Sequence, residues 1–399
     1  MNYCLAIDIA KGKSAVGLFV NEFSNPLIEP YYFKHTLEEL DSLYSKLVKY
    51  GKENITVIME STSVYHLPIE KYFRDKGFAV IVINPIISKD HKRSLRKTKT
   101  DKEDCYNLAG IYFQKRYNDQ SIHETKYMEM QLMSRYIETQ NKNLIRWKCK
   151  LRQLIELTFP EYEEIYSEDK IFTENALNFI KTYPHADIIA KKRIDTLMNT
   201  LASLYRYKPE HYRHKAEAIK DAAKKSLASV PVDSIATHQV SELAGEIIRL
   251  QNMINRNKTR LIEMAKDKKL FHICMSFYGI SNLSAAYLTA ELKDISRFSS
   301  PKKLIASCGL DPTIVQSGRS IDYHGPISKR GNRLARKYLF NIINGMIQLS
   351  YQHHELEEMR LYYEKKRSEG KHHYAAVIAC CTKLLRKIYF RFNDPKFVY

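Results

Sequence analysis

The chain has 399 residues, of which 44% are hydrophobic, so it is long enough for two or three domains with cores of their own. Lysine and arginine outnumber aspartate and glutamate by 64 to 45, which gives a formal net charge of +19. An excess of that size favours a polyanionic partner, nucleic acid before a membrane surface. Neither a membrane-spanning run nor a signal peptide is recognisable, and seven cysteines without a C-x-x-C pair are typical of reduced thiols. We therefore expect a cytoplasmic protein.

The N-terminal third predicts a mixed α/β sheet. Residues 3–9 are almost wholly apolar, as in a central strand that is covered on both faces. Further strands are expected at 15–20, 30–34, 55–59 and 78–83, with helices at 37–48 and 64–75. Three strands followed by alternating helices and strands predict that the first and fourth strands are neighbours near the middle of the sheet.

Four carboxylates lie in or next to elements predicted in the N-terminal third of this otherwise basic chain. Asp8 lies in the first strand and Glu60 directly after the fourth, so the two would lie side by side. A capping box predicts a helix that begins at Asp101 and carries Asp104 on the same face. Grouped carboxylates repel one another unless cations neutralise them, and oxygen ligands suit Mg²⁺. A lone aspartate at a helix start is ordinarily a structural charge, but an unpaired carboxylate in an apolar strand is costly, so we favour a metal site.

Short motifs surround these carboxylates across residues 3–115. They read Ala6-Ile-Asp-Ile-Ala-Lys11, Met59-Glu-Ser-Thr-Ser63, Val82-Ile-Asn-Pro85 and Lys99-Thr-Asp-Lys-Glu-Asp104. In this order and spacing they resemble the N-terminal domain of the IS-one-ten family, the DEDD transposases and their invertase relatives. The resemblance implies an RNase H-like fold of the RuvC type. It also implies that Asp8, Glu60, Asp101 and Asp104 form a tetrad that binds Mg²⁺.

Composition divides the chain into three expected domains. Residues 1–118 hold the sheet, 119–270 are poor in glycine and periodic like helices, and 271–399 are mostly helical with glycine turns. Within the middle domain, apolar residues follow a heptad spacing at Val240, Leu243, Ile247, Leu250, Ile254 and Leu261. This seam predicts a coiled coil that joins chains into a homo-oligomer, or a stripe packed on the chain's own helices.

Several basic residues and one glycine turn are candidate contacts to nucleic acid. The turn at Gly279 lies in a segment that resembles a helix-hairpin-helix, whose backbone N–H groups meet phosphate. The candidates are Lys92, Arg93, Arg96, Lys97, Gly279, Arg319, Lys329, Arg330 and Arg333.

Ser317 stands before a glycine within the last of these basic clusters. A Ser-Gly pair by itself is ordinarily a turn. However, residues 272–345 contain G-L-x-P, S-G and S-K-R-G-N in order, and they resemble the C-terminal domain of the same family. The resemblance implies that Ser317 is a recombination nucleophile. The family often has Ser-Ser-Gly where this chain has Gln316-Ser317-Gly318, and Ser320 falls outside the motif.

The resemblance implies a transposase or site-specific recombinase that cuts and rejoins donor and target DNA. It also implies a structured noncoding guide RNA, a dimer or tetramer, and a composite site that pairs the tetrad with Ser317. The residues by themselves support metal binding, polyanion binding and oligomerisation. Two alternatives stay open: a RuvC-type junction-resolving nuclease that uses water and needs no Ser317, and a basic nucleic-acid-binding scaffold without catalysis.

Overall fold

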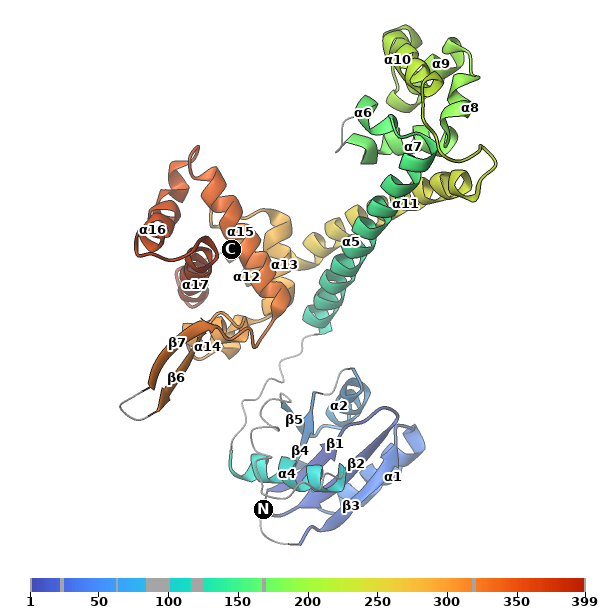
Figure 1. Ribbon diagram of the computed structural model, residues 1–399. Helices are drawn as coiled ribbons and strands as arrows, with labels where there is room; N and C mark the ends of the chain where they lie inside the picture. Colours follow the sequence, from blue (N-terminus) through green and yellow to red (C-terminus); the bar gives the residue numbers. More distant parts are fainter. Residues whose placement is uncertain are drawn as a thin grey trace. The chain divides into compact units, whose positions relative to one another are not determined.

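The computed structural model describes residues 2–21, 25–61, 64–83, 101–115, 125–166, 170–317 and 321–397. It consists of two compact units, an N-terminal unit of residues 1–123 and a C-terminal unit of residues 124–399 (Figure 1). The expected domain boundary after residue 118 lies outside the described residues. The boundary expected after residue 270 falls inside the C-terminal unit.

The N-terminal unit is built on a five-stranded mixed sheet with the order β3-β2-β1-β4-β5. Its strands are β1 (Tyr3–Asp8), β2 (Lys13–Phe19), β3 (Ile28–Lys34), β4 (Ile55–Glu60) and β5 (Ala79–Ile83). The central strand β1 runs antiparallel to β2 and parallel to β4. The predicted neighbourhood of the first and fourth strands is therefore confirmed.

Helices cover both faces of this sheet (Figure 1). The helices α1 (Leu37–Val48) and α2 (His66–Asp75) pack on the face that carries Leu5 and Ile7. The helix α4 (Asp101–Phe113) packs on the opposite face, with Cys4 and Ala6. Because both faces are covered, β1 is apolar at nearly every position rather than at alternate ones.

Two long helices, α5 (Thr125–Thr158) and α11 (Ile235–Ala265), run side by side through the C-terminal unit (Figure 1). Short helices gather at one end of this pair: α6 (Tyr162–Tyr166), α7 (Glu174–Thr182), α8 (Ala186–Ala190), α9 (Ile194–Tyr205) and α10 (Arg213–Lys224). The other end holds α12 (Lys269–Met275), α13 (Asn282–Leu292), α14 (Pro301–Ser307), α15 (Arg333–Leu349), α16 (Glu357–Ser368) and α17 (His373–Phe392). A hairpin of β6 (Pro312–Ser317) and β7 (Ile321–Ile327) extends from this second group.

The heptad seam lies along α11 and is covered within the chain. Val240 and Ile247 are fully buried in the core that includes α7, and Leu250, Ile254 and Leu261 are buried in the core at the other end. Leu243 is partly buried and packs against the first of these cores. The seam therefore matches the second predicted alternative, a stripe packed on the chain's own helices, and these side chains are not available to another chain.

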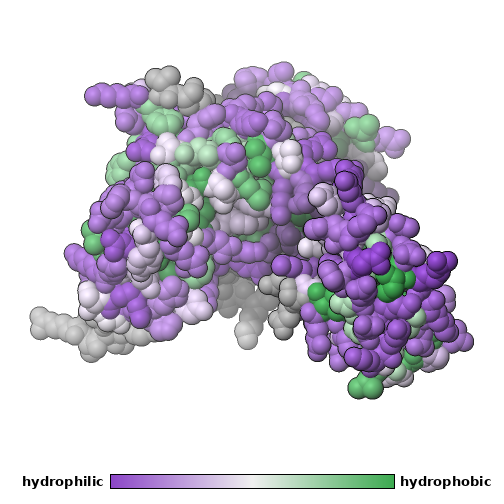
Figure 2. Space-filling model, turned by 90° about the horizontal axis from the view of Figure 1, so that it is seen from above, coloured by the Kyte–Doolittle hydropathy of each residue, from purple (hydrophilic) through white to green (hydrophobic). Residues whose placement is uncertain are grey.

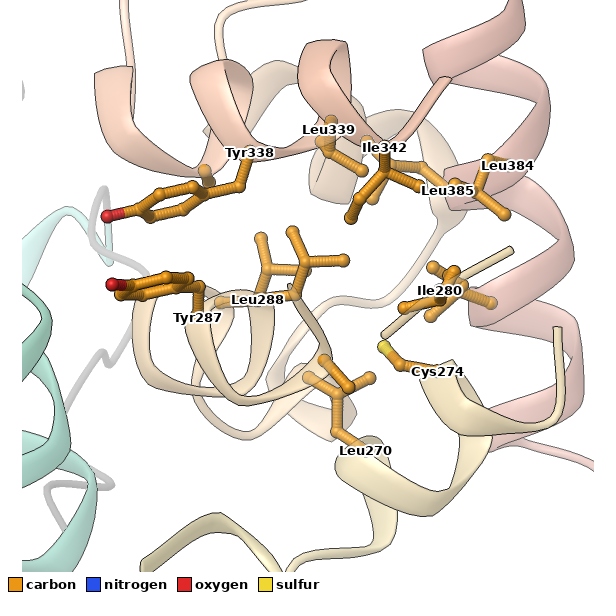
Figure 3. Close-up of a cluster of buried hydrophobic side chains, with 14 of the residues drawn as sticks. Leu270, Cys274, Ile280, Tyr287, Leu288, Tyr338, Leu339, Ile342, Leu384 and Leu385 are labelled. Carbon is orange, nitrogen blue, oxygen red and sulfur yellow. The ribbon is translucent and has the colours of Figure 1, made fainter. Parts of the chain in front are cut away.

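The larger core joins helices that are distant in sequence. The rings of Tyr287 on α13 and Tyr338 on α15 stack with centroids 4.3 Å apart, beside Leu288 and Leu339 (Figure 3). The face of the molecule in Figure 2 is mostly hydrophilic, with hydrophobic side chains in small separate patches. Among the described helices, none is both long and apolar enough to cross a membrane.

Candidate active site and nucleic-acid interface

Asp8 and Glu60 end two neighbouring parallel strands at the same edge of the sheet. The last backbone pair between β1 and β4 joins Ile7 to Met59, so each carboxylate comes one residue later. Side chains alternate between the two faces of a strand. Asp8 lies two residues after Ala6 and Glu60 two after Ile58, and both of those apolar residues pack on α4. Both carboxylates therefore lie on the face that α4 covers, and both are partly buried.

The first turn of α4 brings Asp101 and Asp104 to this face. Asp104 is buried, with 7% of its surface exposed, while Asp101 is exposed. The Asn107 side-chain amide donates a hydrogen bond to Asp104 Oδ1 at 3.5 Å. The predicted helix is present, with Asp101 as its first described residue. Thr100, the expected cap, lies outside the described residues.

The Cys105 thiol reports how close these carboxylates are. Burial raises its pKa to about 12; a hydrogen bond with the Asp8 backbone lowers it, and the charges of Asp8, Asp104 and Asp101 raise it. A charge shifts a pKa appreciably only from nearby. The end of β1 at Asp8 therefore lies close to Cys105, which follows Asp104 on α4 and lies one turn after Asp101.

Tyr32 on β3 lies in the same row of paired residues across the sheet as Asp8. Asp8 pairs with Ala15, and Ala15 pairs with Tyr32. Desolvation raises the pKa of Tyr32; the Asp101 carboxylate adds to the rise through its charge and a hydrogen bond from the hydroxyl, and Asp8 adds further. A tyrosine therefore closes one side of the acidic face, which no spacing in the sequence indicates.

The four carboxylates are chemically suitable ligands for a divalent cation. Four carboxylates from two strands and one helix supply the oxygen ligands that Mg²⁺ prefers. Within the described residues, no three acidic, histidine or cysteine side chains lie close enough together to hold an ion. To bind a cation, these side chains would therefore have to turn toward one point. A bound cation would favour this arrangement because it attracts all of the carboxylates and offsets their mutual repulsion.

Ser317 is the last residue of β6. Its backbone pairs with Ile321, and the base of the hairpin pairs Pro312 with Ile327. Its side chain is not described, and Arg319 and Ser320 lie outside the described residues, as do Lys92, Arg93, Arg96 and Lys97.

The S-K-R-G-N segment follows this hairpin as a tightly held loop. Lys329 has φ 53° and Gly331 has φ 147°, and a Cβ at Gly331 would lie 2.4 Å from the Ser307 carbonyl oxygen. Asn332 then caps α15 by accepting hydrogen bonds from the backbone N–H groups of Leu334 and Ala335, each at 3.0 Å. This loop exposes the side chains of Lys329, Arg330 and Arg333, none of which forms an ion pair with a described residue.

Gly279 lies between α12 and α13, as the helix-hairpin-helix resemblance implies. Its φ is +84°, and a Cβ there would approach Met346 Cγ to 3.0 Å. Backbone conformation and packing against α15 both require glycine. Ser281 caps α13 by accepting from the Ser284 backbone N–H at 3.2 Å.

A buried carboxylate that sequence reasoning missed holds the S-K-R-G-N loop. Glu291 on α13 is 3% exposed and accepts hydrogen bonds from the Asn332 amide at 2.8 Å and the Ser134 hydroxyl at 3.0 Å. Arg135 lies 3.6 Å from it. These residues come from α5, α13 and the loop before α15, so only the fold brings them together.

Sequence models of one transposase family match both ends of the chain. A model described as a DEDD transposase of IS110 matches residues 5–160, and one described as the transposase IS116/IS110/IS902 family matches residues 272–364. The chain belongs to the IS110 (IS-one-ten) family of transposases. Its five-stranded mixed sheet fits the RNase H-like fold that the resemblance implies.

One relative of this IS110-family chain is the uncharacterized 42 kDa protein of insertion element IS900 from Mycobacterium paratuberculosis. The two are 28% identical over 175 residues, which is 43% of this chain and 42% of that protein. The match therefore spans less than half of either protein. The two family matches include every candidate carboxylate, Gly279 and the hairpin that carries Ser317.

Proposed function

We propose that this IS110-family protein cuts and rejoins DNA as the transposase or recombinase of an insertion sequence. The observation that carries the proposal is the placement of Asp8, Glu60, Asp101 and Asp104 on one face of an RNase H-like sheet. That placement supports a site for divalent metal, and Mg²⁺ fits its oxygen-only donors. When bound, such an ion would offset the negative charge of a phosphodiester and make its phosphorus more open to attack.

In this proposal Ser317 is the nucleophile. Its Oγ bonds to phosphorus, the bond from phosphorus to one DNA oxygen breaks, and that oxygen leaves with the serine proton as a hydroxyl. The product is a phosphoserine ester that keeps the bond energy for rejoining. Attack by a hydroxyl of another DNA end reverses the exchange, restores a phosphodiester and releases the serine. The support is the matching S-G position at the end of β6, on a hairpin whose opposite end, at Pro312 and Ile327, leads into the loop that exposes Lys329, Arg330 and Arg333.

The proposed partners are donor and target DNA, a structured noncoding guide RNA and further copies of the chain. The net charge of +19 supports binding to either nucleic acid. Guidance by RNA and a dimeric or tetrameric state rest on the family resemblance.

A water-using junction nuclease is the second candidate. It needs the same carboxylates, so the face under α4 supports it equally, and it is indifferent to Ser317. The non-catalytic scaffold predicts that Asp8 is an ordinary exposed charge, whereas Asp8 is partly buried at the end of a buried strand.

The deciding experiment traps the full-length protein on DNA with Mg²⁺ and looks for a covalent adduct. We expect Ser317→Ala to lose the adduct and recombination while it retains DNA binding. Ser320→Ala, the matched control three residues away, should keep all three. A Ser317→Ala protein that still recombines would favour the water-driven mechanism instead.

A further inference from the structure

A cavity of about 1030 Å³ lies in the C-terminal unit, between α14, α15, α17 and the base of the β6–β7 hairpin. Apolar side chains form much of its lining, among them Ile305, Leu310, Ile327, Phe340 and Ile378. A volume of this size holds a ligand larger than a single amino-acid side chain. We call it the basic groove, because of the charges that surround it.

Cations dominate the border of the basic groove. The charged residues that line it are Lys302, Asp311, Lys329, Arg333, Arg336, Lys337, Lys371 and Arg386. Asp311, the acid among these lining residues, accepts a hydrogen bond from the Ser328 hydroxyl at 2.7 Å. Lys337 pairs with Glu138 at 2.7 Å, and Arg336 donates to the Cys308 carbonyl at 2.6 Å. The other five cations form no ion pair with a described residue, so their charge is open to an anionic ligand.

An aromatic face completes the groove. Tyr374 is 62% exposed and stacks on Phe340, with ring centroids 5.8 Å apart and planes inclined by 23°. The His372 ring also stacks on Tyr374, with centroids 5.5 Å apart and planes inclined by 28°. An exposed ring supported by a second ring from another helix is a platform for a flat ligand. Apolar lining, a stacking face and unpaired cations together describe a ligand with planar rings and several negative charges.

We infer that the basic groove binds single-stranded nucleic acid and stacks an unpaired base on Tyr374, with the phosphates held by Lys302, Lys371 and Arg386. Duplex nucleic acid presents phosphates and base edges outward, so its base faces cannot reach an aromatic ring. An unpaired strand presents its phosphates and the faces of its bases. The inference deepens the proposed function and rests on it for the class of substrate.

The groove lies at the base of the hairpin that carries Ser317. Pro312 lines the groove and begins β6, and Ser317 ends it. Five residue steps of about 3.4 Å place the two ends of β6 roughly 17 Å apart. A strand held in the groove can therefore extend along the hairpin toward the residue that we propose to attack phosphorus. Unpaired nucleotides a few positions from the cut would fix which phosphodiester is presented.

The first test measures stacking directly. A single-stranded oligonucleotide that contains the fluorescent base 2-aminopurine loses fluorescence when that base stacks, and full-length protein without divalent metal should quench it. Tyr374→Ala should lose the quenching and weaken binding by about fivefold to a hundredfold, the range for one base on one aromatic ring. Tyr374→Phe should restore both, because it keeps the ring. Tyr351→Ala removes another exposed tyrosine of the same unit, 72% exposed, and should change neither.

The second test distinguishes binding in the groove from nonspecific attraction to the basic surface. Lys302 and Lys303 are adjacent exposed residues of α14, and of the two only Lys302 lines the groove. Lys302→Gln should reduce the slope of log affinity against log salt by about 0.7 for a single strand. Lys303→Gln removes the same charge and should leave the slope unchanged.

Equal effects of these two variants, or unchanged quenching in Tyr374→Ala, would overturn the inference. So would a preference for duplex over single strand that Tyr374→Ala does not alter. A change of molecular mass in Tyr374→Ala without a change in oligonucleotide binding would make the groove a protein interface instead. Because binding is measured without cleavage, a protein that fails to recombine but quenches as expected would refute the proposed function and leave the groove as a single-strand site.

Discussion

Asp8 shows how strongly one side chain is constrained by its strand. It follows an apolar run buried on both faces, yet it carries a carboxylate to the face under α4, near the Cys105 thiol. Holding several carboxylates close together costs free energy unless a cation offsets their repulsion. Among the described residues Asp8, Glu60 and Asp104 nevertheless lie on the same side of the sheet, which a bound cation would favour.

Replacing Asp8 by Asn should abolish strand cleavage while it leaves nucleic-acid binding intact. Loss of a metal ligand removes several kcal/mol of charge stabilisation, so cleavage should fall at least about a hundredfold. Cleavage assays with Mg²⁺ as the sole divalent ion provide the measurement. Asp75→Asn is the matched control, because Asp75 is an exposed acid of the same unit that pairs with Lys71. Full cleavage by Asp8→Asn would remove the metal site from the proposal.

Cysteine reactivity should single out Cys149. It is exposed, whereas the other six thiols are buried. Burial raises the pKa of each of those six, to about 12 for Cys105, Cys274 and Cys308. A thiol-specific reagent at pH 8 should therefore modify one thiol per folded chain, and none in Cys149→Ser. More than one rapidly reacting thiol in the folded protein would contradict the burial.

The six buried thiols also predict how the stability of the folded protein changes at alkaline pH. A raised pKa means that the folded protein keeps the thiol proton after the unfolded chain has lost it. The free energy of unfolding should then be unaffected by these groups below about pH 9 and should fall as pH rises from about 9 toward 12. Urea denaturation at pH 8 and pH 10 tests the direction. Stability that increases over this interval would show that other groups dominate.

At the scale of elements, α11 shows why a heptad pattern is ambiguous. A partner helix from another chain and α5 of the same chain both satisfy a seam of apolar residues. The two ends of the seam belong to different cores, with Ile247 in one and Leu250 in the other. The helix pair α5–α11 thus joins two helical groups into one unit.

Replacing both Ile247 and Leu250 by Lys should unfold much of the C-terminal unit rather than dissociate an oligomer. Two uncompensated charges in dry cores cost several kcal/mol. Circular dichroism should show a loss of helix. Ile145→Lys introduces the same residue on α5, where Ile145 is 63% exposed, and should leave the fold intact. A folded double mutant with a smaller mass by light scattering would instead indicate a seam between chains.

Asn332 joins a helix cap to the buried Glu291 network, so its loss should be costly. Asn332→Ala removes the cap of α15, worth about 0.5–2 kcal/mol, and leaves Glu291 without one donor, at a further 1–3 kcal/mol. Urea denaturation should show a lower free energy of unfolding. Asn341→Ala, at an exposed position of the same helix, should change it by less than about 0.5 kcal/mol. Equal stabilities of the two variants would argue against the network.

At the scale of the whole molecule, each hydrophobic core lies within one of the two compact units. The two cores of the sheet contain only residues of the N-terminal unit, and the two helical cores contain only residues of the C-terminal unit. Each unit therefore has its own source of cooperative stability.

Calorimetry should resolve two unfolding transitions. Phe73→Ala and Phe179→Ala each empty a fully buried site, at about 3–5 kcal/mol, in the N-terminal and C-terminal units respectively. Each should lower one transition by roughly ten degrees or more and leave the other in place. A single transition that both variants shift equally would mean that the units unfold together.

The sequence by itself determined the local and periodic features. The buried run before Asp8, the helices at 37–48 and 64–75 and the helix that holds Asp101 and Asp104 follow from apolar pattern and capping chemistry, which act over a few residues. The adjacency of the first and fourth strands followed from the order of strands and helices along the chain. The motifs around the carboxylates were sufficient to indicate the family.

Tertiary structure alone decided which distant residues meet. Nothing in the spacing of Glu291, Ser134 and Asn332 predicts that they share hydrogen bonds, or that Lys302 and Tyr374 line one groove. Burial of the α11 seam against α5 was likewise one of two alternatives until the packing was known. The physical reason is that capping and periodicity are properties of neighbouring residues, whereas burial and charge pairing depend on which elements the fold brings together.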